Sequence, residues 1–154
     1  MARWYVGSDH GGFTLRRHLV EHMTAAGHEV VAEHGPAESG QSCDYPDVAI
    51  EVCRAVRDDE GSLGLLVCGT GQGMAISANR VRGIRAALVS DGFSAHMARE
   101  HNDANVLCLG ERVVGPGLAL ELWETFAGAS FEGGRHARRV GKIEAIPVDG
   151  GAGS

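Results

Sequence analysis

A cysteine followed by three alternate glycines is the segment of this chain with the clearest chemical potential. The apolar run Gly64–Val67 leads into Cys68-Gly69-Thr70-Gly71-Gln72-Gly73, and a helix-compatible segment, Met74–Asn79, follows. This order predicts a strand, a tight loop and a helix start. Free backbone N–H groups at such a junction bind anions, and alternate glycines let a ligand approach the backbone closely. Cys68 would stand at the mouth of this site, where the positive end of a helix favours the thiolate and makes it a candidate nucleophile or base.

Two other interpretations of the loop are open. A dinucleotide fingerprint, G-x-G-x-x-G, would be consistent with Asp91 at the end of the next strand, but it needs a glycine at Met74, and the chain has G-x-G-x-G. The loop also follows the third predicted strand rather than the first, in a domain short for a dinucleotide. Alternatively, Cys68 is a small core residue, as most free cysteines are, and Thr70 is an ordinary loop hydroxyl.

Three further polar segments have both a chemical and an ordinary interpretation. Asp9-His10-Gly11-Gly12 follows the first predicted strand and could be a site or a simple helix cap. His101-Asn102-Asp103 could carry chemistry or end a helix, where histidine suits the helix dipole. Arg135, Arg138 and Arg139 fall within about one helical turn, so two of them could clamp a phosphate, although such residues usually form a solvated face.

Short apolar runs alternate with segments of helical spacing along the chain. The predicted strands cover Arg3–Ser8, Glu29–Glu33, Gly64–Cys68, Arg85–Ser90 and Asn105–Leu109. The predicted helices cover Phe13–Ala26, Pro46–Arg57, Met74–Asn79, Phe93–Glu100, Gly117–Ala127 and about Arg135–Ile146. This alternation predicts an α/β fold with a parallel sheet, helices on both faces and ligands at the carboxyl ends of the strands. Three candidate sites fall on that edge: Ser8–Gly12, Cys68–Gly73 and Ser90–Asp91.

Composition narrows the class of protein. The 154 residues, 44% of them apolar, predict one domain over residues 1–146, and the glycine-rich residues 147–154 are expected to form a flexible tail. A net charge of −6 argues against nucleic-acid binding. The four cysteines show no C-x-x-C pair or zinc spacing with histidine, which favours free thiols in a reducing compartment. We expect no membrane span and no leader, and therefore a cytoplasmic protein.

Six signatures occur in order along nearly the whole chain, to about residue 146. They are Gly7-Ser8-Asp9-His10-Gly11-Gly12-Phe13, Asp44-Tyr45-Pro46, Cys68-Gly69-Thr70-Gly71-Gln72-Gly73-Met74, Ile76-Ser77-Ala78-Asn79-Arg80, His101-Asn102-Asp103-Ala104-Asn105-Val106-Leu107 and Glu132-Gly133-Gly134-Arg135-His136. Together they resemble the type B ribose-5-phosphate isomerases, a family that also contains isomerases of galactose, allose and tetrulose phosphates. The resemblance implies a Rossmann-like three-layer sandwich with a five-stranded parallel sheet and additional C-terminal helices. It further implies no metal or organic cofactor, and a homodimer or tetramer with sites shared between chains.

The resemblance also implies roles for individual residues. Cys68 would be the base that moves a proton between C1 and C2 through an enediolate, Thr70 would assist, and His101 would help to open the furanose ring. Backbone N–H groups would hold the developing oxyanion at Gly69, Gly71, Gly73 and Met74. In one branch of the family a glutamate after the glycine loop is the base. Met74 stands at that position here, which leaves Cys68 as the base candidate on the loop.

The same resemblance assigns the substrate contacts. Asp9 and Tyr45 would contact sugar hydroxyls, and Asn102 would support the oxyanion or a sugar oxygen. The phosphate would be held by His10, Arg135 and Arg139, with Arg112 as a further contact. The chain is thus predicted to be an aldose–ketose isomerase that interconverts ribose 5-phosphate and ribulose 5-phosphate. The alternatives are another sugar phosphate, a non-catalytic sugar-phosphate-binding subunit and a nucleotide-binding module.

Overall fold

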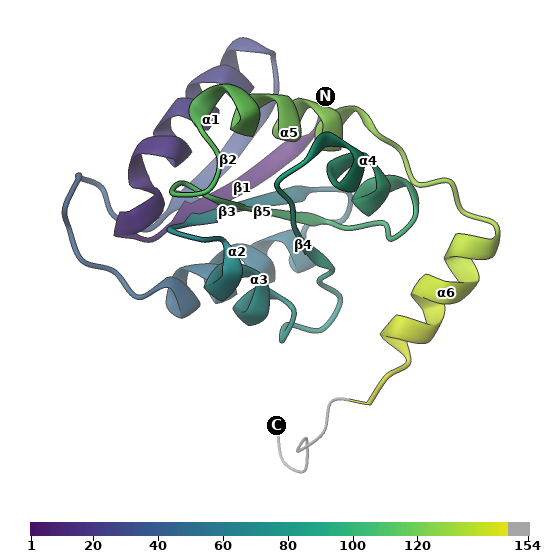
Figure 1. The fold of residues 1–154 in the computed structure, drawn as a ribbon. Helices are drawn as coiled ribbons and strands as arrows, with labels where there is room; N and C mark the ends of the chain where they lie inside the picture. The colour runs from purple at the N-terminus through teal and green to yellow at the C-terminus, as the bar shows by residue number, and fades with distance from the viewer. Residues whose placement is uncertain (148–154) are drawn as a thin grey trace.

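Five parallel strands form the centre of the molecule (Figure 1). The computed structural model describes residues 1–147, so the tail predicted for residues 147–154 lies outside the described part except for Pro147. The strands are β1 (Arg3–Ser8), β2 (Glu29–His34), β3 (Leu63–Cys68), β4 (Ala86–Leu88) and β5 (Val106–Gly110). Their order across the sheet is β2-β1-β3-β5-β4. The predicted α/β class with a five-stranded parallel sheet is therefore confirmed.

Helices cover both faces of this sheet (Figure 1). They are α1 (Phe13–Ala25), α2 (Tyr45–Asp58), α3 (Gln72–Ala78), α4 (Gly92–Glu100), α5 (Pro116–Gly128) and α6 (Arg135–Glu144), with a short 3-10 turn at His10–Gly12. Core side chains of α1, α4 and α5 pack on one face, and those of α2 and α3 pack on the other. No helix within residues 1–147 is both long and apolar enough to span a bilayer.

The central strands are hydrophobic because they are covered on both sides. Every residue of β3 and β5 is buried, which is the pattern of a parallel strand between two helical layers. Alternate side chains of β3 enter different cores: Leu65 and Val67 pack with α1 and α5, whereas Leu66 and Cys68 pack with α2 and α3. The alternation of the strand thus directs the Cys68 side chain toward the layer formed by α2 and α3.

Two elements differ from the sequence prediction. The fourth strand covers Ala86–Leu88 rather than Arg85–Ser90, because the Arg85 N–H donates to the Asn105 side-chain oxygen rather than to the main chain of β5, and the pairing with β5 ends at Leu88. The predicted candidate site at Ser90–Asp91 is a helix cap: the Asp91 carboxylate accepts a hydrogen bond from the Ser94 N–H at 2.8 Å.

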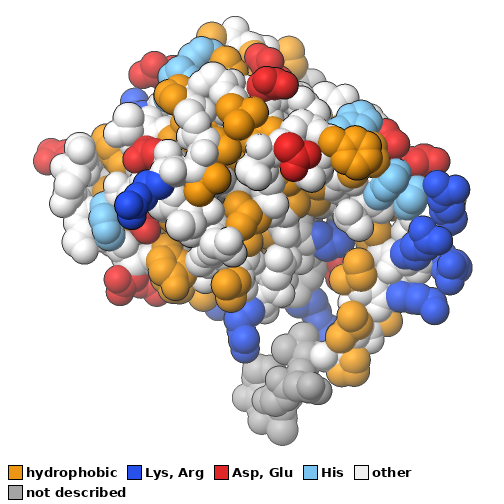
Figure 2. All heavy atoms as spheres, in the orientation of Figure 1, with side chains coloured by type: hydrophobic (Ala, Val, Ile, Leu, Met, Phe, Trp, Pro, Cys, Tyr) orange, Lys and Arg blue, Asp and Glu red, His pale blue; other side chains and the backbone are white. Residues whose placement is uncertain are grey.

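The last helix stands away from the sheet (Figure 1). Within α6 the buried residue is His136, and Ile143 is 46% exposed. Basic side chains gather over this helix, at the right of Figure 2. An amphipathic helix that buries so little of its own apolar surface is typical of an element that packs against another molecule.

Candidate active site

The neighbouring strands β1 and β3 form the switch point of the sheet. The chain leaves β1 toward α1 on one face and leaves β3 toward α3 on the opposite face. Parallel sheets open a crevice at such a point, at the carboxyl ends of the two strands. Cys68 ends β3, and Ser8 ends β1 beside Val67. The glycine loop and the Asp9–Gly12 turn therefore meet where this fold class binds its ligands.

The glycine loop folds back over the thiol. The Gly71 N–H donates a hydrogen bond to Cys68 Sγ at 3.1 Å, and the Gln72 N–H donates to Thr70 Oγ1 at 3.2 Å. Gly71 has a φ of +77°, and a Cβ there would lie 2.5 Å from Leu88 Cδ1 and 3.0 Å from the Leu109 carbonyl carbon. A side chain at this position would push the loop outward. An N–H aimed at sulfur stabilises a thiolate more than a neutral thiol, so the contact suits a base.

The turn after β1 packs directly against this loop. A Cβ on Gly11 would lie 3.3 Å from the Gly69 nitrogen, and one on Gly12 would lie 2.4 Å from the Val67 carbonyl oxygen. Asp9 is almost fully buried and accepts a hydrogen bond from the Gly12 N–H at 3.1 Å. These close approaches explain the glycines of the first signature, because they bring Asp9 and the loop of Cys68 side by side.

Tyr45 and Arg112 complete the same end of the sheet. The Tyr45 ring lies on Gly73, where a Cβ would be 2.5 Å from Tyr45 Cε2. The Arg112 N–H donates to the Gly69 carbonyl oxygen at 3.0 Å, and the Arg112 side chain passes beside Gly69. We call this group of residues, together with the exposed His10, the thiol half-site: Asp9, His10, Tyr45, Cys68, Thr70, Arg112 and the loop glycines.

Met74 contributes to the site differently from the other predicted residues. Its side chain is fully buried in the core between the sheet and α2 and α3. A ligand at the glycine loop could therefore reach Met74 only through its backbone N–H, at the start of α3.

The other predicted site residues lie at the opposite end of the sheet. After β4, helix α4 runs back to the amino ends of the strands, where His101 and Asn102 precede β5. The Asn102 carbonyl oxygen accepts a hydrogen bond from Arg85 Nε at 3.1 Å, and Arg85 stands just before β4. The start of β5 and its end, which pairs with Cys68, are separated by four residue steps, or roughly 13 Å.

Helix α6 joins His101 at this second end. The imidazoles of His101 and His136 stack with their centroids 4.1 Å apart and their planes at 10°, and the Glu132 N–H donates to the Glu100 carbonyl oxygen. We call this group the basic half-site: His101, Asn102, Arg135 and Arg139. Within one chain, the structure thus does not bring the predicted ring-opening histidine and phosphate-binding arginines to Cys68.

Three residues that the sequence prediction missed position the site. Arg16 is 3% exposed, and its guanidinium donates to the carbonyl oxygens of His34 and Pro36 at 2.8 and 2.5 Å. It thereby fixes the start of the loop that leads to Tyr45. Glu111 accepts a hydrogen bond from the Leu15 N–H at 2.6 Å, which anchors the segment carrying Arg112 to α1. His136 is buried under His101. No sequence spacing marks these contacts, because each joins distant segments.

The other three thiols have raised pKa values. Burial raises the pKa of Cys53 to about 12 and raises the pKa of Cys108 well above its usual range. Burial, followed by the nearby Asp9, also raises the pKa of Cys43. A thiol with a raised pKa is a poor nucleophile and base at neutral pH. Cys68 differs from these three thiols in accepting a hydrogen bond from the Gly71 N–H and in standing at the switch point of the sheet, which makes it the thiol best placed for chemistry.

A doubly wound parallel sheet with a thiol, a carboxylate and a glycine loop at its switch point defines a small α/β enzyme. Comparison with known proteins gives the family. The family model described as ribose/galactose isomerase matches residues 5–143, and the chain belongs to this family. It is an aldose–ketose isomerase.

Individual relatives cover almost the whole chain. The chain is 45% identical to ribose-5-phosphate isomerase B of Escherichia coli over 91% of its own length and 93% of the relative's. It is 41% identical to D-erythrulose-4-phosphate isomerase of Pectobacterium atrosepticum, covering 90% of each chain. Its structure is similar to that of ribose-5-phosphate isomerase B from Clostridium thermocellum, with a TM-score of 0.89, 48% identity, and coverage of 92% and 95% of the two chains.

Proposed function

We propose that this chain interconverts ribose 5-phosphate and ribulose 5-phosphate, with Cys68 as the base. The observation that carries the proposal is the Cys68 thiol under the Gly71 N–H, at a loop edge lined by backbone donors. The relatives named for ribose-5-phosphate isomerase B support this substrate. The relative named for D-erythrulose 4-phosphate supports a shorter sugar as the second candidate.

The reaction needs a base beside the sugar carbons and donors for the oxygen that becomes negative. The Cys68 thiolate takes the proton from C2 of the open-chain aldose, and the C2–H electron pair becomes the double bond of an enediolate. Backbone N–H groups of Gly69, Gly73 and Met74 hold the negative oxygen, whereas the Gly71 N–H faces the thiol instead of the predicted oxyanion. The thiol returns the proton to C1 while a proton moves between the two oxygens, a transfer that Thr70 Oγ1 is placed to assist. The two proton transfers conserve every atom and electron of the sugar, so this reaction requires no cofactor.

Ring opening falls to the basic half-site of a second copy of this chain, whose Arg135 and Arg139 hold the phosphate together with His10 and Arg112 of the thiol half-site. One chain offers the thiol half-site at the carboxyl end of its sheet and His101, Arg135 and Arg139 near the amino end. A twofold pair in which α6 of each chain reaches the partner's glycine loop would complete two sites at once. The remote phosphate would then supply the binding energy that positions C1 and C2.

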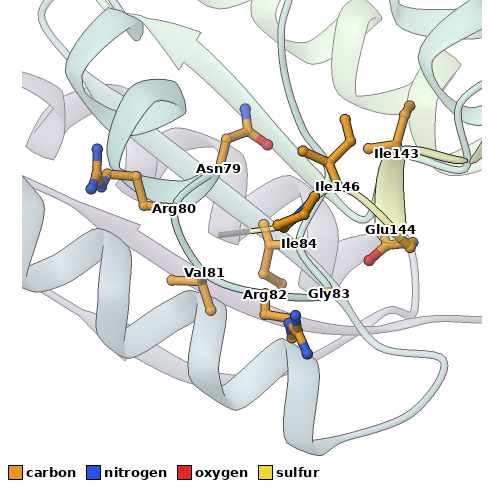
Figure 3. Close-up of a pocket in the computed structure, with 10 residues that line it drawn as sticks. Asn79, Arg80, Val81, Arg82, Gly83, Ile84, Ile143, Glu144 and Ile146 are labelled. Carbon is orange, nitrogen blue, oxygen red and sulfur yellow. The ribbon is translucent and has the colours of Figure 1, made fainter. Parts of the chain in front are cut away.

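The surface around α6 supports this pairing. A cavity of about 430 Å³ separates the end of α6 from the segment Asn79–Ile84, and Ile143 and Ile146 line it (Figure 3). Ile143 is 46% exposed, and Ile146 is 63% exposed. Exposed apolar side chains beside a protruding helix favour burial against a second molecule.

An isomerisation assay of the purified protein without added metal tests the proposal. Ribose 5-phosphate, erythrose 4-phosphate, allose 6-phosphate and galactose 6-phosphate would be compared for the native chain, Cys68→Ala and the matched control Cys43→Ser. We expect the highest kcat/KM on ribose 5-phosphate, a loss of at least about 100-fold in kcat in Cys68→Ala, and little change in Cys43→Ser. A higher kcat/KM on another sugar would overturn the substrate assignment. Full turnover in Cys68→Ala would show that Cys68 is not the base.

A cytoplasmic location and a homodimer belong to the same proposal. Fractionation of the source cells and light scattering of the purified chain test them. Recovery of the protein outside the cytoplasm, or a monomer that isomerises sugar at full rate, would contradict them.

A further inference from the structure

Three side chains at the base of α6 bring metal-ligating atoms together. One ligand atom each from His101, Glu132 and His136 lies within 4.8 Å of the other two. His136 Nε2 is 3.4 Å from Glu132 Oε2, and His101 Nε2 is 3.9 Å from the same oxygen. Two imidazole nitrogens and one carboxylate oxygen form the donor set typical of a zinc site with an open fourth position.

The buried member of this cluster has a free ring nitrogen. His136 is 5% exposed, and its Nε2 finds no hydrogen-bond partner among residues 1–147. Its approach to Glu132 is close enough for attraction but lacks the alignment of a hydrogen bond. An unsatisfied buried nitrogen costs about 1–3 kcal/mol. A cation bound between His136 and Glu132 would satisfy this nitrogen.

The spacing requires only a local adjustment. Bonds of about 2.0–2.1 Å in a tetrahedral site place the ligand atoms roughly 3.4 Å apart. The pair His136–Glu132 already meets this separation. His101 stacks flat on His136, so its ring must rotate to aim Nε2 at the same ion. The side chain of His101 is 36% exposed and lies just after the end of α4, which leaves it room to turn.

We propose that His101, Glu132 and His136 bind one divalent transition-metal ion of the zinc type per chain. Bound metal holds the nitrogen of His101 that would otherwise exchange a proton. The consequence for activity rests on the proposed function: because His101 opens the sugar ring there, metal binding inhibits isomerisation reversibly. The site is regulatory, and the reaction itself proceeds without the metal.

Direct metal binding tests the site independently of activity. Zn²⁺ would be titrated into the full-length protein in competition with a chromophoric chelator at pH 7.5, for the native chain, Glu132→Gln and the matched control Glu21→Gln on α1. Glu132 is exposed, so the substitution preserves the fold while removing a charged ligand. We expect one Zn²⁺ per chain, at least a tenfold weaker affinity in Glu132→Gln, and native affinity in Glu21→Gln.

The Cys68→Ala variant excludes the thiol as the metal ligand. Unchanged stoichiometry in Cys68→Ala is expected, whereas loss of the ion there, or equal affinity in native protein and Glu132→Gln, would overturn the proposal. In the activity measurements, the Zn²⁺ concentration that inhibits the native enzyme should be at least tenfold lower than the concentration that inhibits Glu132→Gln. A chelator should restore turnover. Binding at the three residues without inhibition would overturn the regulatory role. If the protein binds Zn²⁺ at these residues but isomerises no sugar, the metal site stands and the proposed function is refuted.

Discussion

Replacing Gly71 with alanine tests how strongly the glycine loop is constrained around the thiol. Gly71 adopts a φ of +77°, which costs an alanine about 1–2 kcal/mol. The added Cβ would also lie 2.5 Å from Leu88 Cδ1 and 3.0 Å from the Leu109 carbonyl carbon, an overlap that costs about 1–3 kcal/mol. The sum is a loss of roughly 2–5 kcal/mol in the free energy of unfolding.

Gly61→Ala is the matched control for this experiment. Gly61 has a similar φ of +82°, but a Cβ there meets nothing within 4 Å. The backbone strain and the effect of alanine on the unfolded chain are the same in both variants, so their difference isolates the steric overlap. Gly71→Ala should therefore be less stable than Gly61→Ala by about 1–3 kcal/mol, or roughly 2–12 °C in Tm for a chain of this length.

Activity gives the second measurement in the same pair. Moving the Gly71 N–H away from Cys68 Sγ weakens its support for the thiolate, so kcat/KM should fall about 10- to 100-fold in Gly71→Ala and stay near native in Gly61→Ala. Denaturant unfolding and steady-state kinetics would be recorded on both variants. Equal stability and equal activity in the two proteins would refute the steric reasoning.

Substitutions at Arg16, His28 and Arg139 should each change a measurable property of the protein. Arg16→Leu removes charge-assisted hydrogen bonds to the His34 and Pro36 carbonyls, so the free energy of unfolding in urea should fall by about 1.5–3 kcal/mol. KM should rise, because these bonds fix the start of the loop that leads to Tyr45. An unchanged KM would contradict this positioning role. Burial, followed by the N-terminal ammonium group, lowers the pKa of His28 below 6.5 in the folded protein. Because the unfolded chain then binds the proton first, the free energy of unfolding is unaffected by this group above about pH 6.5 and falls as the pH drops toward the folded pKa. Thermal unfolding from pH 8 to 5 should show this decline, and His28→Asn should flatten it. Arg139→Ala should raise KM for ribose 5-phosphate at least about tenfold without lowering Tm, whereas Arg138→Ala beside it should not; equal effects would refute a specific phosphate contact.

Local patterns predicted most of the fold. The buried strands β3 and β5 are continuous apolar runs, and their ends were marked by glycine and polar residues, so their bounds differ from the predictions by about one residue. Strand β4 was predicted too long because Arg85 continues the extended pattern, whereas its N–H donates to the side chain of Asn105. That partner lies 20 residues away, beyond what local spacing reveals.

The site was predictable only in part. Alternate glycines after a buried strand indicated the Cys68 loop, and the signatures indicated the residues around it. The separation of His101 from Cys68 depends on the direction in which α4 crosses the sheet, and nothing in the local sequence indicates which chain supplies each half. The burial of His136 and Arg16 likewise arises from tertiary packing. The assignments of individual catalytic and binding residues therefore stay predictions.

Mixing two inactive variants tests the central claim most directly. Cys68→Ala removes the base from the thiol half-site, and His101→Asn removes the ring-opening histidine from the basic half-site. Each variant alone should isomerise ribose 5-phosphate at a small fraction of the native rate. Subunits exchanged under mild denaturant and returned to buffer should form mixed pairs, each with one site carrying both native groups, and recover about a quarter of the native activity. A mixture that stays as inactive as its components, although mass spectrometry shows mixed pairs, would contradict a site shared between chains.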